Sequence, residues 1–163
     1  MDYKYFKDIT ELKEYATNND ISNIIVQFGH LTSDDIVNNI NIFKKIKCLD
    51  CTWTQITEIP KELTNLQELY CSGSSITEIP KELINLTRLY CSKTLVKEIP
   101  KELINLQKLY CCKTSIKEIP KELINLRTLN CSYTMITEIP VTLELLENID
   151  SEIITLVRYK NEK

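Results

Sequence analysis

Hydrophobic residues follow a pattern that repeats every twenty residues between Ile46 and Leu145. In each of the five blocks, positions 1, 4, 6, 11, 14 and 18 hold an apolar residue or cysteine, and position 15 holds proline. No insertion interrupts the period. Positions 4 and 6 are apolar in every block while positions 3, 5 and 7 vary, which predicts one short strand per block with a single buried face.

The repeated strands imply one architecture. A strand that returns after every twenty residues must run parallel to its predecessor, because antiparallel pairing would require alternate blocks to reverse direction. Proline fixes φ and cannot donate to a sheet, so position 15 ends the extended segment and suits a single helical or 3₁₀ turn over the following Lys-Glu-Leu. The sequence therefore predicts an α/β solenoid.

The consensus LxxLxCxx(S/T)x(I/V)xxIPxxL resembles the leucine-rich repeat. That resemblance implies a right-handed solenoid with a short parallel strand per repeat on the concave side, short helical or 3₁₀ turns on the convex side and a helical N-terminal cap. Position 9, usually asparagine in the family, is threonine or serine here, which predicts a less firmly braced turn. The short blocks and the IPKELINL phrasing are also similar to repeat proteins of giant DNA viruses of amoebae (mimivirus-like), which would imply the host cytoplasm.

The segments outside the five blocks are expected to cover the open ends of the solenoid. We divide the chain into an N-terminal cap with an irregular first coil (1–45), the five repeats (46–145), and a closing coil with a tail (146–163). Within the cap, the pattern predicts an amphipathic helix near Ile9 to Ala16 and a second, capped helix from about Ser33 to Lys44.

Five of the seven cysteines occupy position 6 of successive blocks: Cys51, Cys71, Cys91, Cys111 and Cys131. A disulfide framework is disfavoured because the total is odd and parallel in-register side chains point the same way. We interpret the five as a buried column in which cysteine acts as a small hydrophobe, with a metal or redox column as the alternative. Cys112 at position 7 and Cys48 at position 3 are expected to be exposed thiols on the concave side.

The composition of the chain excludes several classes of function. The net charge of −3 combines 20 Lys and Arg with 23 Asp and Glu without a long run of one sign, so we expect no nucleic-acid partner. The chain shows neither a signal peptide nor an apolar window of about 18 residues, which predicts no membrane association and a cytoplasmic protein. The single histidine, His30, and the isolated glycines Gly29 and Gly73 form no catalytic or phosphate-binding motif, so we expect neither enzyme activity nor a cofactor.

The concave face, defined here by the side chains at positions 3, 5 and 8, is the candidate binding surface. The tyrosines of position 5 can simply pack ring on ring and stiffen the sheet, but tyrosine, tryptophan and arginine are also the residues that most often anchor interfaces. We expect a monomer that binds a partner protein here; the alternatives are a glycan or small-molecule binder that uses the aromatic stripe, and a structural scaffold without a specific partner. The predicted contact residues are Asp50, Trp53, Glu68, Tyr70, Arg88, Tyr90, Lys93, Lys108, Tyr110, Lys113, Asn130 and Tyr133.

The convex side carries a glutamate at position 13 of each block and a lysine three residues later in the first four blocks. Interleaved opposite charges favour a solvated face over a calcium site. Ile84, Ile104 and Ile124 at position 19 can belong either to the core or to an exposed apolar strip, and in the second case they mark another contact surface.

Overall fold

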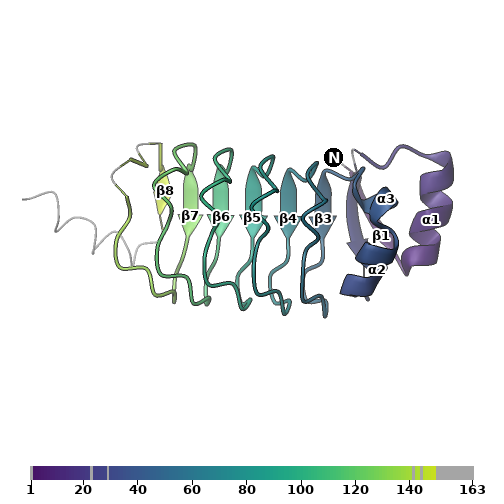
Figure 1. Ribbon diagram of the computed structural model, residues 1–163, viewed down its shortest axis with the longest axis horizontal. Helices are drawn as coiled ribbons and strands as arrows, with labels where there is room; N and C mark the ends of the chain where they lie inside the picture. Colours follow the sequence, from purple (N-terminus) through teal and green to yellow (C-terminus); the bar gives the residue numbers. More distant parts are fainter. Residues whose placement is uncertain (1, 23, 29, 141, 144, 150–163) are drawn as a thin grey trace, which may run out of the picture.

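A computed structural model describes residues 2–22, 24–28, 30–140, 142–143 and 145–149 of the chain. Its strands form one parallel sheet in which spatial order equals chain order, from β1 to β8. The strands stand side by side in Figure 1, one per coil, with the helices at the N-terminal end. The strands are β1 (Asp2–Phe6), β2 (Ile24–Phe28), β3 (Cys48–Asp50), β4 (Glu68–Tyr70), β5 (Arg88–Tyr90), β6 (Lys108–Tyr110), β7 (Thr128–Asn130) and β8 (Asn148–Ile149).

The predicted leucine-rich-repeat solenoid is confirmed by this sheet. Position 4 of each block pairs with position 4 of the next, as in the register Leu69 to Leu89 and Leu89 to Leu109. On the convex side two successive hydrogen-bonded turns follow the proline of each block, such as Leu83 N–H to Pro80 O at 3.2 Å and Leu86 N–H to Leu83 O at 3.0 Å, rather than a regular helix. Twenty residues are therefore enough for one short strand, tight hydrogen-bonded turns and the extended connections between them.

The core consists of columns that run the length of the solenoid. The leucines of positions 1, 4 and 18 are buried throughout the repeats, and so are the isoleucines and valine of position 11. The five position-6 cysteines are no more than 1% exposed, as expected for small hydrophobes, and Cys51, Cys71, Cys91 and Cys111 are free thiols. The position-9 hydroxyls are largely buried too, and each donates to the carbonyl of the cysteine three residues earlier, as Thr94 Oγ1 does to Cys91 O at 2.6 Å.

Asparagine at position 20 supplies a brace that the sequence did not lead us to expect. Asn85 Nδ2 donates to Thr64 O at 2.8 Å, and Asn105 Nδ2 donates to Ile84 O at 2.9 Å. Asn65 and Asn125 make the equivalent bond to their preceding coils. The family usually has an asparagine at position 9, whereas here the asparagine is at position 20. Its side-chain amide joins each coil to the preceding one by a hydrogen bond.

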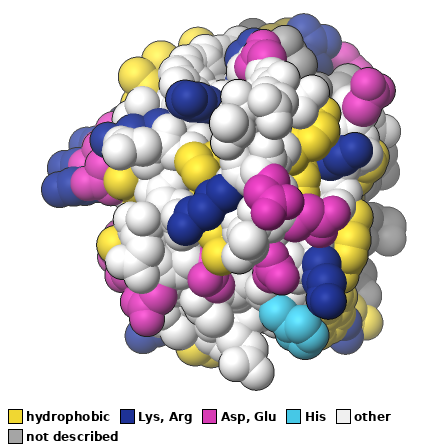
Figure 2. Space-filling model, turned by 90° about the vertical axis from the view of Figure 1, so that its right-hand side faces the viewer, with side chains coloured by type: hydrophobic (Ala, Val, Ile, Leu, Met, Phe, Trp, Pro, Cys, Tyr) yellow, Lys and Arg dark blue, Asp and Glu magenta, His cyan; other side chains and the backbone are white. Residues whose placement is uncertain are grey.

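The N-terminal cap contains helices α1 (Ile9–Asn18), α2 (Ser33–Asn38) and α3 (Ile40–Phe43). Asp8 caps α1 by accepting from the backbone of Thr10 and Glu11, and Thr32 and Asp35 form a capping box on α2. Strand β1, which the sequence did not predict, pairs with β2, and its Phe6 is 1% exposed in the core. Figure 2 looks onto this end, where charged side chains of both signs are interspersed with small hydrophobic patches.

At the C-terminal end, Leu146 and Ile149 are partly buried against the core. Residue Ile149 belongs to β8 and pairs with Leu129, so the parallel sheet continues beyond the fifth block. The rest of the predicted closing coil and tail, 150–163, lies outside the described residues.

Candidate functional site

The concave face gathers side chains from every strand between β1 and β7. The sheet register aligns Arg88 with Glu68 and Lys108 in the position-3 column, and aligns the three tyrosines of position 5 with one another. It therefore brings the predicted strand residues onto one continuous surface. Whether they bind a partner stays a prediction.

Strand β1 extends this surface beyond what the sequence predicted. Tyr3 pairs with Ile25, which pairs with Cys48, so Tyr3 continues the position-3 column. Tyr5 pairs with Gln27, which pairs with Asp50, so Tyr5 continues the position-5 column. Both tyrosine side chains are at least 60% exposed. The alternation of tyrosine at residues 3 and 5 was the available signal, but the segment carries no repeat to reveal its register.

Tyr70, Tyr90 and Tyr110 form a continuous stack of rings. Neighbouring ring centroids are 4.6 Å apart in both pairs, and the interplanar angles are 14° and 8°. The rings thus pack on one another, and each ring contact adds about 0.5–1.5 kcal/mol. Since Tyr90 is covered on both faces by its neighbours, the stack presents ring edges and hydroxyl groups to solvent.

Glu68 lies at the acidic end of the concave face and is fully engaged by its neighbours. It is 8% exposed, and its Oε2 accepts the Tyr70 hydroxyl at 2.8 Å while its Oε1 accepts Arg88 Nη1 at 2.8 Å. Burial raises the pKa of Tyr70, and the hydrogen bond that Tyr70 donates to Glu68 raises it further. The carboxylate in turn raises the pKa of Arg88. Glu68 therefore holds the side chains of Tyr70 and Arg88 in place on the concave face.

Asp50 and Asn130 flank the tyrosine stack and bond to their own coils or to the adjacent one. Asp50 Oδ1 accepts the Thr52 backbone N–H at 3.0 Å. Asn130 Oδ1 accepts the Cys112 thiol at 2.6 Å and the Ser132 hydroxyl at 3.2 Å. These acceptors are already used within the protein.

Position 8 is held in the left-handed region of backbone conformation, with φ between 56° and 60° at Trp53, Lys93, Lys113 and Tyr133 and 72° at Gly73. The Trp53 indole lies across Gly73, where an added Cβ would come within 2.3 Å of Trp53 Cε3. Lys93 Nζ lies 4.9 Å from the Trp53 ring, and Lys113 Nζ lies 5.4 Å from the Tyr133 ring. The Lys93 side chain thus extends toward Trp53 and the Lys113 side chain toward Tyr133, in opposite directions along the solenoid.

Cys48 and Cys112 differ from each other. Cys48 is fully buried, so the prediction that it is an exposed thiol is wrong: it lies between Ile25 and Glu68, which are themselves buried on the paired strands. Burial raises the pKa of Cys48 to about 12, with the carboxylates of Glu68 and Asp50 adding to the effect. Cys112 is half-buried on the concave side and donates to Asn130.

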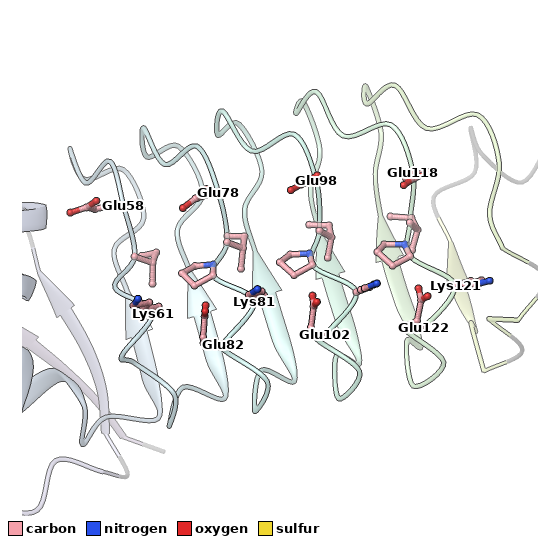
Figure 3. A pocket seen from close by; sticks show the side chains of 18 of the residues that line it. Glu58, Lys61, Glu78, Lys81, Glu82, Glu98, Glu102, Glu118, Lys121 and Glu122 are labelled. Atoms are coloured by element: carbon pink, nitrogen blue, oxygen red, sulfur yellow. The ribbon is translucent and has the colours of Figure 1, made fainter.

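A groove of about 1200 Å³ runs along the convex side. In Figure 3, Glu58, Glu78, Glu98 and Glu118 follow one side, and Glu82, Glu102 and Glu122 follow the other together with Lys61, Lys81 and Lys121. Isoleucines and prolines of positions 14 and 15 also line it. The two ion pairs seen in the described part of the chain, Arg88–Glu68 and Arg127–Glu147, lie outside this groove. Ile84, Ile104 and Ile124 are 49–53% exposed, so they form a convex strip rather than core.

The residues that the structure describes contain neither a candidate metal site nor a candidate membrane-spanning helix. His30 is exposed, and within those residues there is no group of three or more His, Cys, Asp and Glu side chains that could hold a metal ion. None of the described helices is both long and apolar enough to cross a bilayer.

Comparisons with known proteins agree with the repeat pattern. The family model described as Leucine Rich Repeat matches residues 65–86, while the comparison with curated proteins gives no match. A leucine-rich repeat protein of Leptospira interrogans is similar in structure, with 28% identity over 79% of this chain and 37% of that one and a TM-score of 0.62. The functional domain of InlJ from Listeria monocytogenes, described as including a cysteine ladder, shares 21% identity over 82% of this chain and 36% of that one, with a TM-score of 0.68.

A plant receptor also has this fold. The peptide hormone receptor RGFR1 in complex with RGF2 shares 26% identity over 77% of this chain and 23% of that one, with a TM-score of 0.59. The chain spans less than two fifths of the length of each of these three structures. Together with the repeat, these findings support a leucine-rich repeat protein.

Proposed function

We propose that the protein is a non-enzymatic interaction module that binds a partner protein through its concave face. The observation that carries this proposal is the unbroken aromatic and polar surface from Tyr3 and Tyr5 on β1 to Tyr133 beyond β7. The similar plant receptor is described in complex with the peptide hormone RGF2, which supports recognition of a polypeptide by this fold.

The rigidity of the concave face supports the same proposal. The tyrosine stack, the Glu68–Arg88 ion pair and the hydrogen bonds of Asn130 fix the side chains before any partner arrives. A preformed surface loses less conformational entropy on association, so more of the contact energy appears as affinity. Trp53 and Tyr133 stand at either end of the position-8 column and are 67% and 70% exposed, which suits them to anchor a partner.

The glycan-binding alternative is less favoured by the ring geometry. A stacking platform needs free aromatic faces, whereas Tyr90 is covered by its two neighbours and the Trp53 indole lies across Gly73. Ring edges and hydroxyls, which the stack does present, suit polar contacts along a polypeptide better than stacking against sugar rings.

The test compares two pairs of substitutions in the same two coils. Tyr90→Ala with Tyr110→Ala alters the concave face, and Lys101→Ala with Lys121→Ala alters the convex face. Affinity capture from a lysate of the native host, followed by quantitative mass spectrometry, should show partners that are lost with the tyrosine pair and retained with the lysine pair. Tyr90→Phe with Tyr110→Phe keeps the ring stack and controls for loss of folding. Partners unaffected by the tyrosine pair, or removed by the lysine pair, would overturn the proposal.

A further inference from the structure

On the concave face the carboxylates already accept hydrogen bonds, whereas several of the donors have no carboxylate partner among the described residues. Glu68 accepts from Tyr70 and Arg88, and Asp50 accepts from Thr52. In contrast, Lys93, Lys108 and Lys113 have no carboxylate within ion-pair distance in the described part of the chain. The surface therefore offers uncompensated positive charge to whatever binds it.

The tyrosine stack adds hydrogen-bond donors to this excess of positive charge. Among the described residues, the hydroxyl groups of Tyr90 and Tyr110 make no side-chain hydrogen bond like the one that Tyr70 donates to Glu68. Their ring edges, which carry the positive part of the aromatic quadrupole, are the accessible part of the stack because the negative faces are turned toward neighbouring rings. Hydroxyl donors, ring edges and ammonium groups all favour the same ligand chemistry, which is an anionic group rich in acceptors.

The positions of the lysines suit an extended chain. Lys108 at position 3 and Lys113 at position 8 lie on opposite sides of Tyr110 in one coil, and Lys93 belongs to the coil before. The stretch from Trp53 to Tyr133 covers four steps between coils, or about 19 Å at about 4.8 Å per step, which about six extended residues would span. Alternate side chains of such a segment point to opposite sides, so they can reach Lys108 on one side and Lys93 and Lys113 on the other.

We propose that the partner contributes an acidic extended segment, which runs along the solenoid over the tyrosine stack. Its carboxylates pair with Lys93, Lys108 and Lys113 and accept from the hydroxyls of Tyr90 and Tyr110. Its apolar side chains contact Trp53 and Tyr133. This inference rests on the proposed function and specifies the chemistry of the partner.

A polypeptide fits these observations better than a nucleic acid. The whole chain has a net charge of −3, and Asp50 and Glu68 lie toward one end of the concave face, so a long polyanion of uniform charge would be repelled beyond the three lysines. A short segment with a few carboxylates and some apolar side chains matches a small basic area between aromatic residues.

The experiment selects binders from a random octapeptide library displayed on phage, using the full chain as bait. Three variants are matched baits: Tyr90→Ala with Tyr110→Ala; Lys93→Gln with Lys108→Gln and Lys113→Gln; and Lys61→Gln with Lys81→Gln and Lys101→Gln as a convex control of equal charge change. Circular dichroism checks that each is folded. We expect the enriched peptides to carry at least two Asp or Glu, and to bind the concave lysine variant at least tenfold more weakly but the convex variant within twofold of the unaltered protein.

The possible failures are distinguishable. Neutral or basic peptides that need Tyr90 and Tyr110 would overturn the acidic segment while leaving the concave interface in place. Failure to enrich any peptide over the tyrosine variant would overturn the proposed function itself. A fluorescein-labelled twelve-nucleotide single-stranded RNA is the counter-probe, and if it bound in a way that required the three concave lysines, the inference of a polypeptide would be wrong.

Discussion

Replacing Gly73 by alanine tests whether the Trp53 indole is held against the backbone of the next coil. Gly73 has φ +72°, and its added Cβ would lie 2.3 Å from Trp53 Cε3 and 2.6 Å from Cδ2. The ring must therefore move, and the backbone must hold an alanine in the left-handed region.

The expected cost combines these two effects. A non-glycine residue in the left-handed region costs about 1–2 kcal/mol, of which about 0.4–1 kcal/mol is offset because alanine restricts the unfolded chain. Displacing the indole from Lys93 Nζ, at 4.9 Å, forfeits about 0.5–1 kcal/mol. The net loss is about 1–2 kcal/mol, which should lower the melting temperature by about 2–8 °C for a chain of this size.

Trp53 is the single tryptophan of the chain, so its fluorescence reports its displacement directly. Thermal unfolding gives the stability, and acrylamide quenching gives the accessibility of the indole, which should rise in Gly73→Ala because the face now against Gly73 becomes open. In a Trp53→Ala background the same glycine substitution should cost less, since only the backbone term remains. Unchanged quenching together with an unchanged melting temperature would refute the packing of Trp53 on Gly73.

Three further predictions follow from the core and its braces. Stability, measured as the urea midpoint under reducing conditions, should fall as pH rises from about 9 toward 12. Buried Cys48 and Cys91 have a pKa of about 12 each, so they keep their thiol protons in this range while the unfolded chain releases them. A urea midpoint that does not change with pH would contradict this. Alkylation of the native protein, followed by mass spectrometry, should modify Cys112 first and the position-6 cysteines only after denaturation, and equal rates would show that the column is open. Asn105→Ala should cost about 0.5–1.5 kcal/mol in urea unfolding, while the neighbouring Ile104→Ala, at an exposed side chain, should cost less.

The repeat made most of the fold predictable. Each block repeats the same buried positions, so one assignment of Leu69 and Cys71 to the inside fixes the equivalent residues of every other block. The same logic put the strands in parallel register and aligned the tyrosines of position 5. The position-19 isoleucines could not be assigned, because an apolar residue beside a turn fits either environment, and they proved to be exposed.

Features outside the repeat, or between coils, were not predictable in the same way. Strand β1 has one buried side chain, Phe6, in five residues, which is too little for a periodic signal. Cys48 was expected to be exposed from its position in the block, but its burial depends on Ile25 of the irregular first coil. The contact of Trp53 with Gly73 and Lys93 depends on which residues meet across successive coils, and a pattern within one block does not contain that information.

The position-20 asparagines make the length of the protein adjustable in whole turns. Asn105 bonds to Ile84 O and Asn125 to Ile104 O, which are equivalent carbonyls in consecutive blocks. Excision of residues 86–105 would therefore let Asn125 meet Ile84 O and stack Tyr110 directly on Tyr70, with each new neighbour equivalent to the one removed. A gene that gains or loses one such block would lengthen or shorten the concave face by a single step, and leave the two ends of the molecule unaltered.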